Sequence, residues 1–277
     1  MQWQHPEISR VIRSALEEDI GAGDVTTEAC VPAETRGAGV FLARQALVLA
    51  GVELLPEIYQ VPGGIERVQL LHHSGDEIRA DEAVARVEGR LRTLLTAERT
   101  ALNFLQRLSG IATLAHRFVR AVEGTGCRVL DTRKTTPGMR RLEKLAVAAG
   151  GASNHRFGLF DAVLIKNNHI TAAGGIRPAI ERVRATGQPV EIEVHSRAEL
   201  EEALDCGADH LLLDNFSAAE VAQAVRQIGG RARVEVSGGI TLETVRAYAE
   251  AGADFVSAGA LTHSAPAVDL SFRIGLC

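Results

Sequence analysis

The stretch Asp209-His-Leu-Leu-Leu-Asp214 decides the expected fold, because two similar windows lie at regular distances from it. Asp161-Ala-Val-Leu-Ile-Lys166 begins 48 residues before it, and Asp254-Phe-Val-Ser-Ala-Gly259 begins 45 residues after it. The last two windows each follow a Gly-Ala pair, Gly207-Ala208 and Gly252-Ala253. A short apolar run bounded by polar residues is typical of a buried strand, so the recurrence predicts a repeated strand–helix unit.

Strands and amphipathic helices are expected to alternate from residue 127 onward. The strands are predicted at 127–131, 161–166, 190–194, 209–214, 233–236 and 254–258. The helices between them are predicted at about 138–149, 174–185, 197–206, 217–228 and 241–251. Short connections between alternating elements imply a parallel sheet covered by helices. Because no GxGxxG follows the first strand, we favour an α/β barrel over a doubly wound sheet, although the usual barrel has eight strands.

The first ninety residues have a different pattern. Short apolar runs alternate there with Gly, Asp and Pro clusters, which predicts short strands and turns with one helix at 52–59. Residues 93–122 carry a helical period, which we expect Ser109-Gly110 to divide into two helices. The change of pattern places a domain boundary near residue 110.

Composition limits the class of protein. The 277 residues suit roughly two domains, or one barrel with an appendage. Thirty basic and thirty-five acidic residues leave a net charge of −5, which argues against nucleic acid or an anionic membrane as a partner. The sequence contains neither a long apolar run nor a recognisable secretory signal, so no membrane span or export is expected. Four scattered cysteines without a CxxC pair fit free thiols in a reducing cytosol.

The carboxyl ends of the predicted strands carry the candidate functional groups, as is usual in α/β barrels. These ends are Asp131-Thr132-Arg133-Lys134, Lys166, Glu193, Asp214, Ser237-Gly238-Gly239 and Gly259-Ala260. A further cluster, Asn154-His155-Arg156, precedes the second strand. Glu193 and Asp214 are hard oxygen ligands that suit Mg²⁺ or ribose hydroxyls. Cations, carboxylates and glycine-rich turns on one rim predict a polyanionic substrate together with a divalent ion.

Each of these features also has an ordinary structural interpretation. Arg133-Lys134 alone could be a solvated charge pair, and Lys166 could form a salt bridge at the rim. Ser237-Gly238-Gly239 could be a plain turn, or it could bind phosphate ahead of a helix capped at Thr241. The coincidence of these groups on matched strand ends is what favours a functional site.

Several motifs resemble the quinolinate phosphoribosyltransferase family, also called carboxylating nicotinate-nucleotide pyrophosphorylases. The most specific are Asp131-Thr-Arg-Lys-Thr-Thr-Pro-Gly-Met-Arg140, Asn154-His155-Arg156 and Leu164-Ile-Lys-Asn-Asn-His169. Further matches at 18–26, 97–103, 142–144, 150–151, 213–216 and 259–264 extend the resemblance over nearly the whole chain. The departures, at Ala152, Phe160 and Asn167, remove no charged group that the chemistry needs.

The resemblance implies an α/β fold in two parts. An N-terminal α/β sandwich would occupy residues 1–110, and an open, incomplete TIM-like barrel would occupy residues 111–277, with the extreme C-terminus packing back on the first domain. It implies a cytoplasmic homodimer, or a higher oligomer, whose active site borrows from the neighbouring subunit. The implied reaction transfers phosphoribose from phosphoribosyl pyrophosphate to quinolinate. It yields nicotinate mononucleotide, pyrophosphate and CO₂ for de novo NAD biosynthesis.

The same resemblance assigns roles to residues of this chain. The expected quinolinate-binding residues are Arg133, His155, Arg156 and Lys166, with Arg99 supplied by the partner subunit. The expected residues for phosphoribosyl pyrophosphate are Lys134, Glu193, Asp214, Ser237, Gly238, Gly239, Gly259 and Ala260. Lys134, Lys166, Glu193 and Asp214 are the expected catalytic residues, and the last two would hold Mg²⁺ directly or through water. Guanidinium forks suit the two adjacent carboxylates of quinolinate.

Three alternatives remain open at this stage. A paralogue associated with molybdenum transport shares much of the fold, but the full set Arg133, His155, Arg156 and Lys166 favours the quinolinate enzyme. Another barrel enzyme acting on a sugar phosphate would not need four cations near the first two strands. A non-catalytic binding protein would have less need for the acidic residues at 193 and 214.

Overall fold

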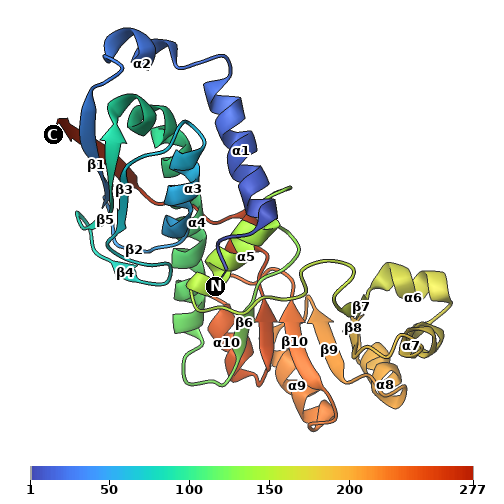
Figure 1. The fold of residues 1–277 in the computed structure, drawn as a ribbon. Coiled ribbons are helices and arrows are strands. Elements are labelled where there is room, and N and C mark those ends of the chain that lie inside the picture. The colour runs from blue at the N-terminus through green and yellow to red at the C-terminus, as the bar shows by residue number, and fades with distance from the viewer. Residues whose placement is uncertain (1, 277) are drawn as a thin grey trace. The chain divides into compact units, whose positions relative to one another are not determined.

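The computed structural model describes residues 2–276 and divides them into two compact units (Figure 1). The first unit consists of the chain up to His116, the segment Thr135–Gly151 and the chain from Ser264 onward, and the second of Arg117–Lys134 and Ala152–His263. These limits differ from the boundary expected at residue 110. The chain passes between the units several times, so a single cut in the sequence does not separate them.

The first unit contains a four-stranded antiparallel sheet in the order β12-β1-β5-β3. Its strands are β12 (Leu270–Leu276), β1 (Arg36–Ala43), β5 (Ala83–Arg90) and β3 (Arg67–Leu70). β2 (Leu47–Val48) and β4 (Glu77–Ile78) form a second, small sheet. Every second residue of β1 is buried, so one face of the strand packs against the core. Because β12 pairs with β1, residues 270–276 lie in the same sheet as the first strand of the chain.

The helices of the first unit are α1 (Pro6–Ile20), α2 (Val25–Cys30), η1 (Val52–Leu54), α3 (Leu55–Gln60), α5 (Arg140–Ala149) and most of α4 (Leu91–Ala121). All of them except α2, whose one buried residue is Thr27, bury apolar residues. In α1 the buried residues are Ile8, Ile12 and Leu16, which share one face at a spacing of four. The helix begins after His5, whose ring accepts the Glu7 N–H.

The long helix α4 is continuous, so the prediction of a break at Ser109-Gly110 is wrong. Ser109 is fully buried and its Oγ accepts the Ala50 N–H at 3.0 Å. A Cβ at Gly110 would lie 2.1 Å from the carbonyl oxygen of Pro266. The two small residues therefore allow other segments to approach the helix closely, and they do not interrupt it.

The second unit is built on six parallel strands in the order β6-β11-β10-β9-β8-β7. They are β6 (Arg128–Leu130), β7 (Val163–Ile165), β8 (Val190–Val194), β9 (His210–Asp214), β10 (Arg233–Ser237) and β11 (Phe255–Ser257). Each agrees with a predicted strand to within one or two residues. The consecutive strands β6 and β7 stand at opposite ends of this order, which gives an open α/β barrel of six strands in place of a closed one of eight.

The helices of the second unit lie between these strands along the chain, except the last of them, which follows β11. They are α6 (Asn167–Ala173), α7 (Ile176–Arg184), α8 (Arg197–Asp205), α9 (Ala218–Ile228), α10 (Val245–Glu250) and α11 (Ala260–His263). Ser196 and Ser217 cap α8 and α9 by accepting the backbone N–H groups of Glu199 and Glu220. α6 was not predicted, and α10 begins four residues later than expected.

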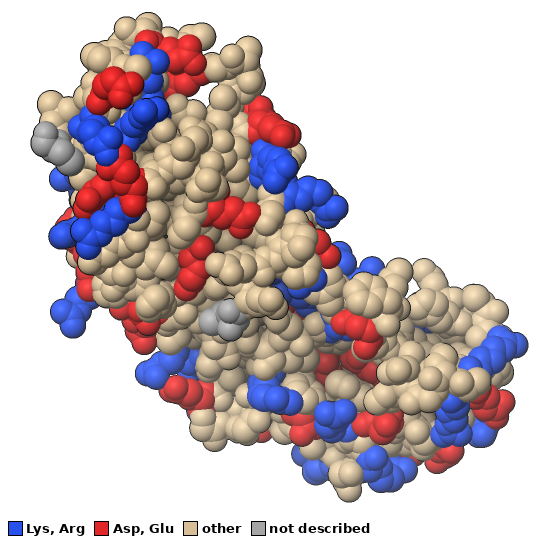
Figure 2. Space-filling model, viewed as in Figure 1, with Lys and Arg blue, Asp and Glu red and all other residues tan. Residues whose placement is uncertain are grey.

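No helix within residues 2–276 is long and apolar enough to span a membrane. Cys30, Cys127 and Cys206 are free thiols, and Cys277 lies outside the described residues. Acidic and basic side chains are interspersed over the face drawn in Figure 2. On this face, therefore, no single sign of charge dominates a large area.

Candidate active site

A pocket of about 540 Å³ is formed within the second unit by the strand ends and the loops that follow them. Its lining includes all the predicted site residues of this unit, namely Arg133, Lys134, His155, Arg156, Lys166, Glu193, Asp214, Ser237, Gly238, Gly239, Gly259 and Ala260. Glu235, Ser257 and His263 also line it and were not predicted. Arg99 is exposed on α4 in the first unit and is not among the lining residues.

Asp131, at the end of β6, fixes the loop that carries His155 and Arg156. Its side chain is fully buried. Oδ1 accepts the His155 backbone N–H at 2.8 Å, and Oδ2 accepts from the Asn154 amide at 2.7 Å. A parallel β-bridge between Leu130 and Ser153 also joins this loop to β6. The buried carboxylate therefore ties a loop distant in sequence to the end of the first barrel strand.

Two arginines bring positive charge into the same wall of the pocket. Burial lowers the pKa of Arg156, and the nearby Arg133 guanidinium acts in the same direction, while Glu191 opposes the shift. A guanidinium group is not deprotonated in proteins, so this shift does not remove the charge of Arg156. Two neighbouring guanidinium groups in a partly desolvated pocket favour the binding of a dianion, which relieves their repulsion.

An ion pair at the rim joins the end of β7 to the end of β8. Lys166 Nζ donates to a carboxylate oxygen of Glu193. The salt bridge considered as an ordinary role for Lys166 is thus present, within the pocket lining. Asp214, at the end of β9, accepts from Ser237 Oγ at 2.7 Å. The first contact links the ends of β7 and β8, and the second links the ends of β9 and β10.

A third side chain, His195, lies between the two rim carboxylates and was not predicted. Its Nε2 is 3.5 Å from Glu193 Oε1, and its Nδ1 is 3.8 Å from Asp214 Oδ2. One ligand atom from each of these three residues lies within 4.8 Å of the others. Carboxylate oxygens at this spacing fit a divalent cation such as Mg²⁺. The position of His195, two residues beyond Glu193 and therefore on the same face, was the available sequence signal.

The glycine turn after β10 has a conformation that requires glycine. Gly238 has φ +95°, and a Cβ there would lie 2.3 Å from the Asn215 side-chain oxygen. The prediction that this turn leads into a helix capped at Thr241 is wrong, because α10 begins at Val245 with Thr244 at the N-cap position. The amides after Ser237 therefore belong to a loop that lines the pocket and are not a helix N-terminus.

The loop before α11 also approaches its neighbour closely. A Cβ at Gly259 would lie 2.9 Å from the Lys134 side chain. The backbone carbonyl of Lys134 accepts a hydrogen bond from Thr262 Oγ1 at 2.8 Å, and the backbone N–H of Lys134 donates to Thr132 Oγ1. These contacts fix the backbone of Lys134 next to the Gly259-Ala260 turn.

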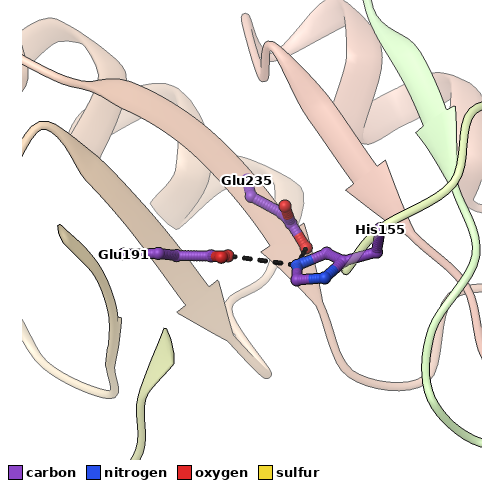
Figure 3. Close-up of side chains that lie close together, drawn as sticks. All are labelled: His155, Glu191 and Glu235. Carbon is purple, nitrogen blue, oxygen red and sulfur yellow. Dashed lines mark hydrogen bonds and ion pairs between the residues drawn. The ribbon is translucent and has the colours of Figure 1, made fainter. Parts of the chain in front are cut away.

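Two buried glutamates face His155 from β8 and β10 (Figure 3). His155 Nε2 is 3.4 Å from Glu191 Oε1 and 3.5 Å from Glu235 Oε1. Burial raises the pKa of Glu235 to about 7, and the Glu191 carboxylate acts in the same direction. Neither glutamate was predicted, although a charged residue in the middle of an apolar strand is a signal that the sequence did contain.

Comparison with known proteins gives the family of this fold and site. The family model "Quinolinate phosphoribosyl transferase, N-terminal domain" matches residues 24–109, and the model for the C-terminal domain matches residues 111–273. The chain belongs to the quinolinate phosphoribosyl transferase family. Relatives of this chain include the "Nicotinate-nucleotide pyrophosphorylase [carboxylating]" of Mycobacterium leprae, which is 42% identical over 273 residues, 95% of each chain.

Further similarities extend over almost the full length of the chain. The "Probable nicotinate-nucleotide pyrophosphorylase [carboxylating]" of Bacillus subtilis is 38% identical over 277 residues, which is 98% of this chain and 95% of the relative. The crystal structure of NadC from Streptococcus pyogenes has a TM-score of 0.94 and 38% identity, and the match covers 99% of each chain. The expected family is therefore confirmed by both sequence and fold.

Proposed function

We infer that this chain catalyses the reaction after which its family is named. It transfers phosphoribose from phosphoribosyl pyrophosphate to the ring nitrogen of quinolinate, with loss of pyrophosphate and CO₂, and yields nicotinate mononucleotide for de novo NAD biosynthesis. The observation that carries the assignment to this pocket is the convergence of Arg133, Arg156 and Lys166 on one lining that also contains Glu193 and Asp214. Cations bind the pyridine diacid, and carboxylates bind the pentose and a metal ion.

Quinolinate is bound by the cationic wall. Its two adjacent carboxylates accept from the guanidinium groups of Arg133 and Arg156, and Lys166 adds an ammonium group at the rim. The ion pair with Glu193 holds the Lys166 ammonium group at this rim. Loss of the 2-carboxylate leaves a carbanion beside the quaternised ring nitrogen, so the substrate itself supplies much of the stabilisation.

Phosphoribosyl pyrophosphate is bound along the strand ends. Glu193 and Asp214 would hold ribose hydroxyls and Mg²⁺, and Lys134 would contact the pyrophosphate. The residues that cradle the 5′-phosphate, largely through backbone amides, are Ser237, Gly238, Gly239, Gly259 and Ala260. A Mg²⁺ ion held by the carboxylates of Glu193 and Asp214 would supply positive charge to neutralise the pyrophosphate leaving group. Catalysis then depends mainly on orientation and on charges already in place, without a covalent nucleophile.

The active assembly is proposed to be a cytoplasmic homodimer. Arg99 is exposed on α4, where it is available to a second copy of the chain. We assign Arg99 of the partner subunit to the quinolinate site, as a further guanidinium for the diacid. The scattered free thiols fit a reducing compartment.

The assignment is tested by quinolinate binding to Arg156→Ala. The substitution removes one partner of a desolvated charge pair, so affinity should fall by about 2–5 kcal/mol. Isothermal titration calorimetry measures this directly, and Arg177→Ala is the matched control, since Arg177 is an exposed arginine of the same unit outside the pocket. Native affinity in Arg156→Ala would contradict the proposed site.

A further inference from the structure

His155 lies where three parts of the second unit meet. Its backbone N–H donates to Asp131 after β6, and its ring faces Glu191 on β8 and Glu235 on β10 (Figure 3). Only 12% of the His155 side chain is exposed, and the Glu235 side chain is fully buried. The next residue along the chain is Arg156, which we assign to the substrate diacid.

The two ring nitrogens of His155 have different partners. Nδ1 accepts the backbone N–H of Arg156 at 2.7 Å. A backbone amide always brings the hydrogen, so Nδ1 carries none and the ring holds its proton on Nε2. That Nε2–H faces one carboxylate oxygen of Glu191 and one of Glu235. The contacts therefore define the neutral Nε2–H tautomer.

This tautomer excludes a metal at the same cluster. His155, Glu191 and Glu235 have the composition and spacing of a metal site. A histidine that ligates through Nε2 normally donates its Nδ1–H to an acceptor, whereas Nδ1 here accepts an N–H. Ligation with the present contacts would require a ring without a proton on either nitrogen. The glutamates thus act on His155 as hydrogen-bond acceptors and do not share a cation with it.

The same contacts make the ring a poor receptor for a substrate carboxylate. Its one proton already faces two buried acidic groups, and a third carboxylate at Nε2 would add negative charge beside them. By contrast, the contact with Arg156 acts on a group that can bind the substrate. Arg156 Nη1 also donates to the Ala162 carbonyl at 3.1 Å, so the residue is held at both its backbone and its guanidinium.

We propose that His155 is a positioning residue for Arg156, and that Glu191 and Glu235 are positioning residues for His155. Glu191 and Glu235 hold the imidazole in one tautomer, and the imidazole holds the Arg156 backbone so that its guanidinium is aimed into the pocket. This replaces the direct quinolinate contact expected for His155. The inference rests on the proposed function in one respect, that Arg156 binds a substrate carboxylate.

The tautomer is measured by ¹⁵N NMR on the full-length protein labelled at the histidine ring nitrogens. The His155 signals are assigned by their loss in His155→Asn. We expect an unprotonated Nδ1 and a protonated Nε2, both unchanged when the diacid phthalate is added. A protonated Nδ1 would overturn the proposal, since either metal ligation or an imidazolium that binds the diacid requires it.

Two variants separate positioning from a purely structural role. Asparagine places its Oδ1 where Nδ1 of histidine lies, so His155→Asn keeps the acceptor for the Arg156 N–H, whereas His155→Leu removes it. The KM for quinolinate should rise on the order of 10- to 100-fold in His155→Leu and recover most of this in His155→Asn. The KM for phosphoribosyl pyrophosphate should change by less than about twofold in both, because no contact with Arg156 serves that substrate.

Arg156→Ala distinguishes failure of this inference from failure of the proposed function. Unchanged quinolinate affinity in Arg156→Ala would refute the proposed site itself. If Arg156→Ala weakens binding while His155→Leu retains the native KM, only the positioning role is refuted. The NMR measurement uses the native protein and therefore tests the positioning role even if the leucine variant does not fold.

Discussion

On β8 and β10, polar residues two positions apart connect the interior of the second unit to the rim of the pocket. Glu191 and Glu193 are two residues apart on β8, as are Glu235 and Ser237 on β10. Residues at this spacing point to the same side of a strand. In both strands the first residue of the pair faces His155, and the second reaches the rim. One face of each strand thus connects the buried carboxylates to the proposed substrate site.

The buried carboxyl of Glu235 makes stability depend on pH. In the folded protein its pKa is raised to about 7 by burial and by Glu191, against 4.5 for an ordinary glutamate. The folded state therefore binds an extra proton between these values, and the stabilisation from this proton is lost as pH rises through 7. The full effect is about 3 kcal/mol at most, from the size of the pKa difference.

Glu235→Gln should consequently gain stability relative to the native chain as pH increases. Thermal midpoints of both proteins at pH 5 and pH 8 measure the difference, and each protein serves as its own reference across pH. The thermal midpoint of Glu235→Gln, relative to that of the native chain, should be higher at pH 8 than at pH 5. A difference that is independent of pH, or that favours the native chain at pH 8, would contradict the raised pKa.

At the scale of helices and strands, the sequence pattern predicted those elements whose apolar residues recur at the spacing of a strand or a helix. The six barrel strands were predicted because each is a short apolar run, and α8 and α9 because each has an amphipathic helical period. α6 was missed because Asn167-Asn168-His169 is a weak helix-forming sequence. Its first turn depends on His169 Nδ1, which accepts the Lys166 N–H at 2.9 Å.

The site residues at the carboxyl ends of strands were predictable from the sequence. The contacts between side chains inside the barrel were not. The family motifs and the strand ends led to Arg133, Lys166 and Asp214. The contact of His155 with Glu191 and Glu235 joins a loop to two strands that are separated by β9 in the sheet, and no spacing in the sequence encodes it.

The close approach at Gly110 gives a test of packing on α4. Alanine in place of glycine usually stabilises a helix by about 1 kcal/mol. Here the new Cβ would lie 2.1 Å from the Pro266 carbonyl oxygen, so Gly110→Ala should instead lower stability by about 1–3 kcal/mol.

Urea denaturation of Gly110→Ala and the native chain measures the sign of this effect. Gly275→Ala is the control, because a Cβ at Gly275 would have no neighbour within 4 Å. An increase in the stability of Gly110→Ala would show that the helix is not packed as described.

At the scale of the whole molecule, the account requires two chains for one complete site. Arg99→Ala and Lys134→Ala should each be inactive alone. When the two proteins are mixed and their subunits exchange, a heterodimer has one pocket with an intact Lys134 and Arg99 of the partner subunit. An equal mixture should therefore regain about one quarter of native activity, as expected for a twofold dimer.

A second mixture controls for nonspecific recovery of activity. Lys134→Ala and Arg156→Ala both change the same pocket, so each pocket of their heterodimer remains defective and no activity should return. No recovery with Arg99→Ala, in subunits shown to exchange, would mean that Arg99 does not act across the dimer.

The most direct test of the central claim is the stoichiometry of products from quinolinate labelled in its 2-carboxylate. With phosphoribosyl pyrophosphate and Mg²⁺, the purified protein should release labelled CO₂ and pyrophosphate in equal amounts, and neither when one substrate is omitted. Absence of both products, or pyrophosphate released without labelled CO₂, would contradict the account.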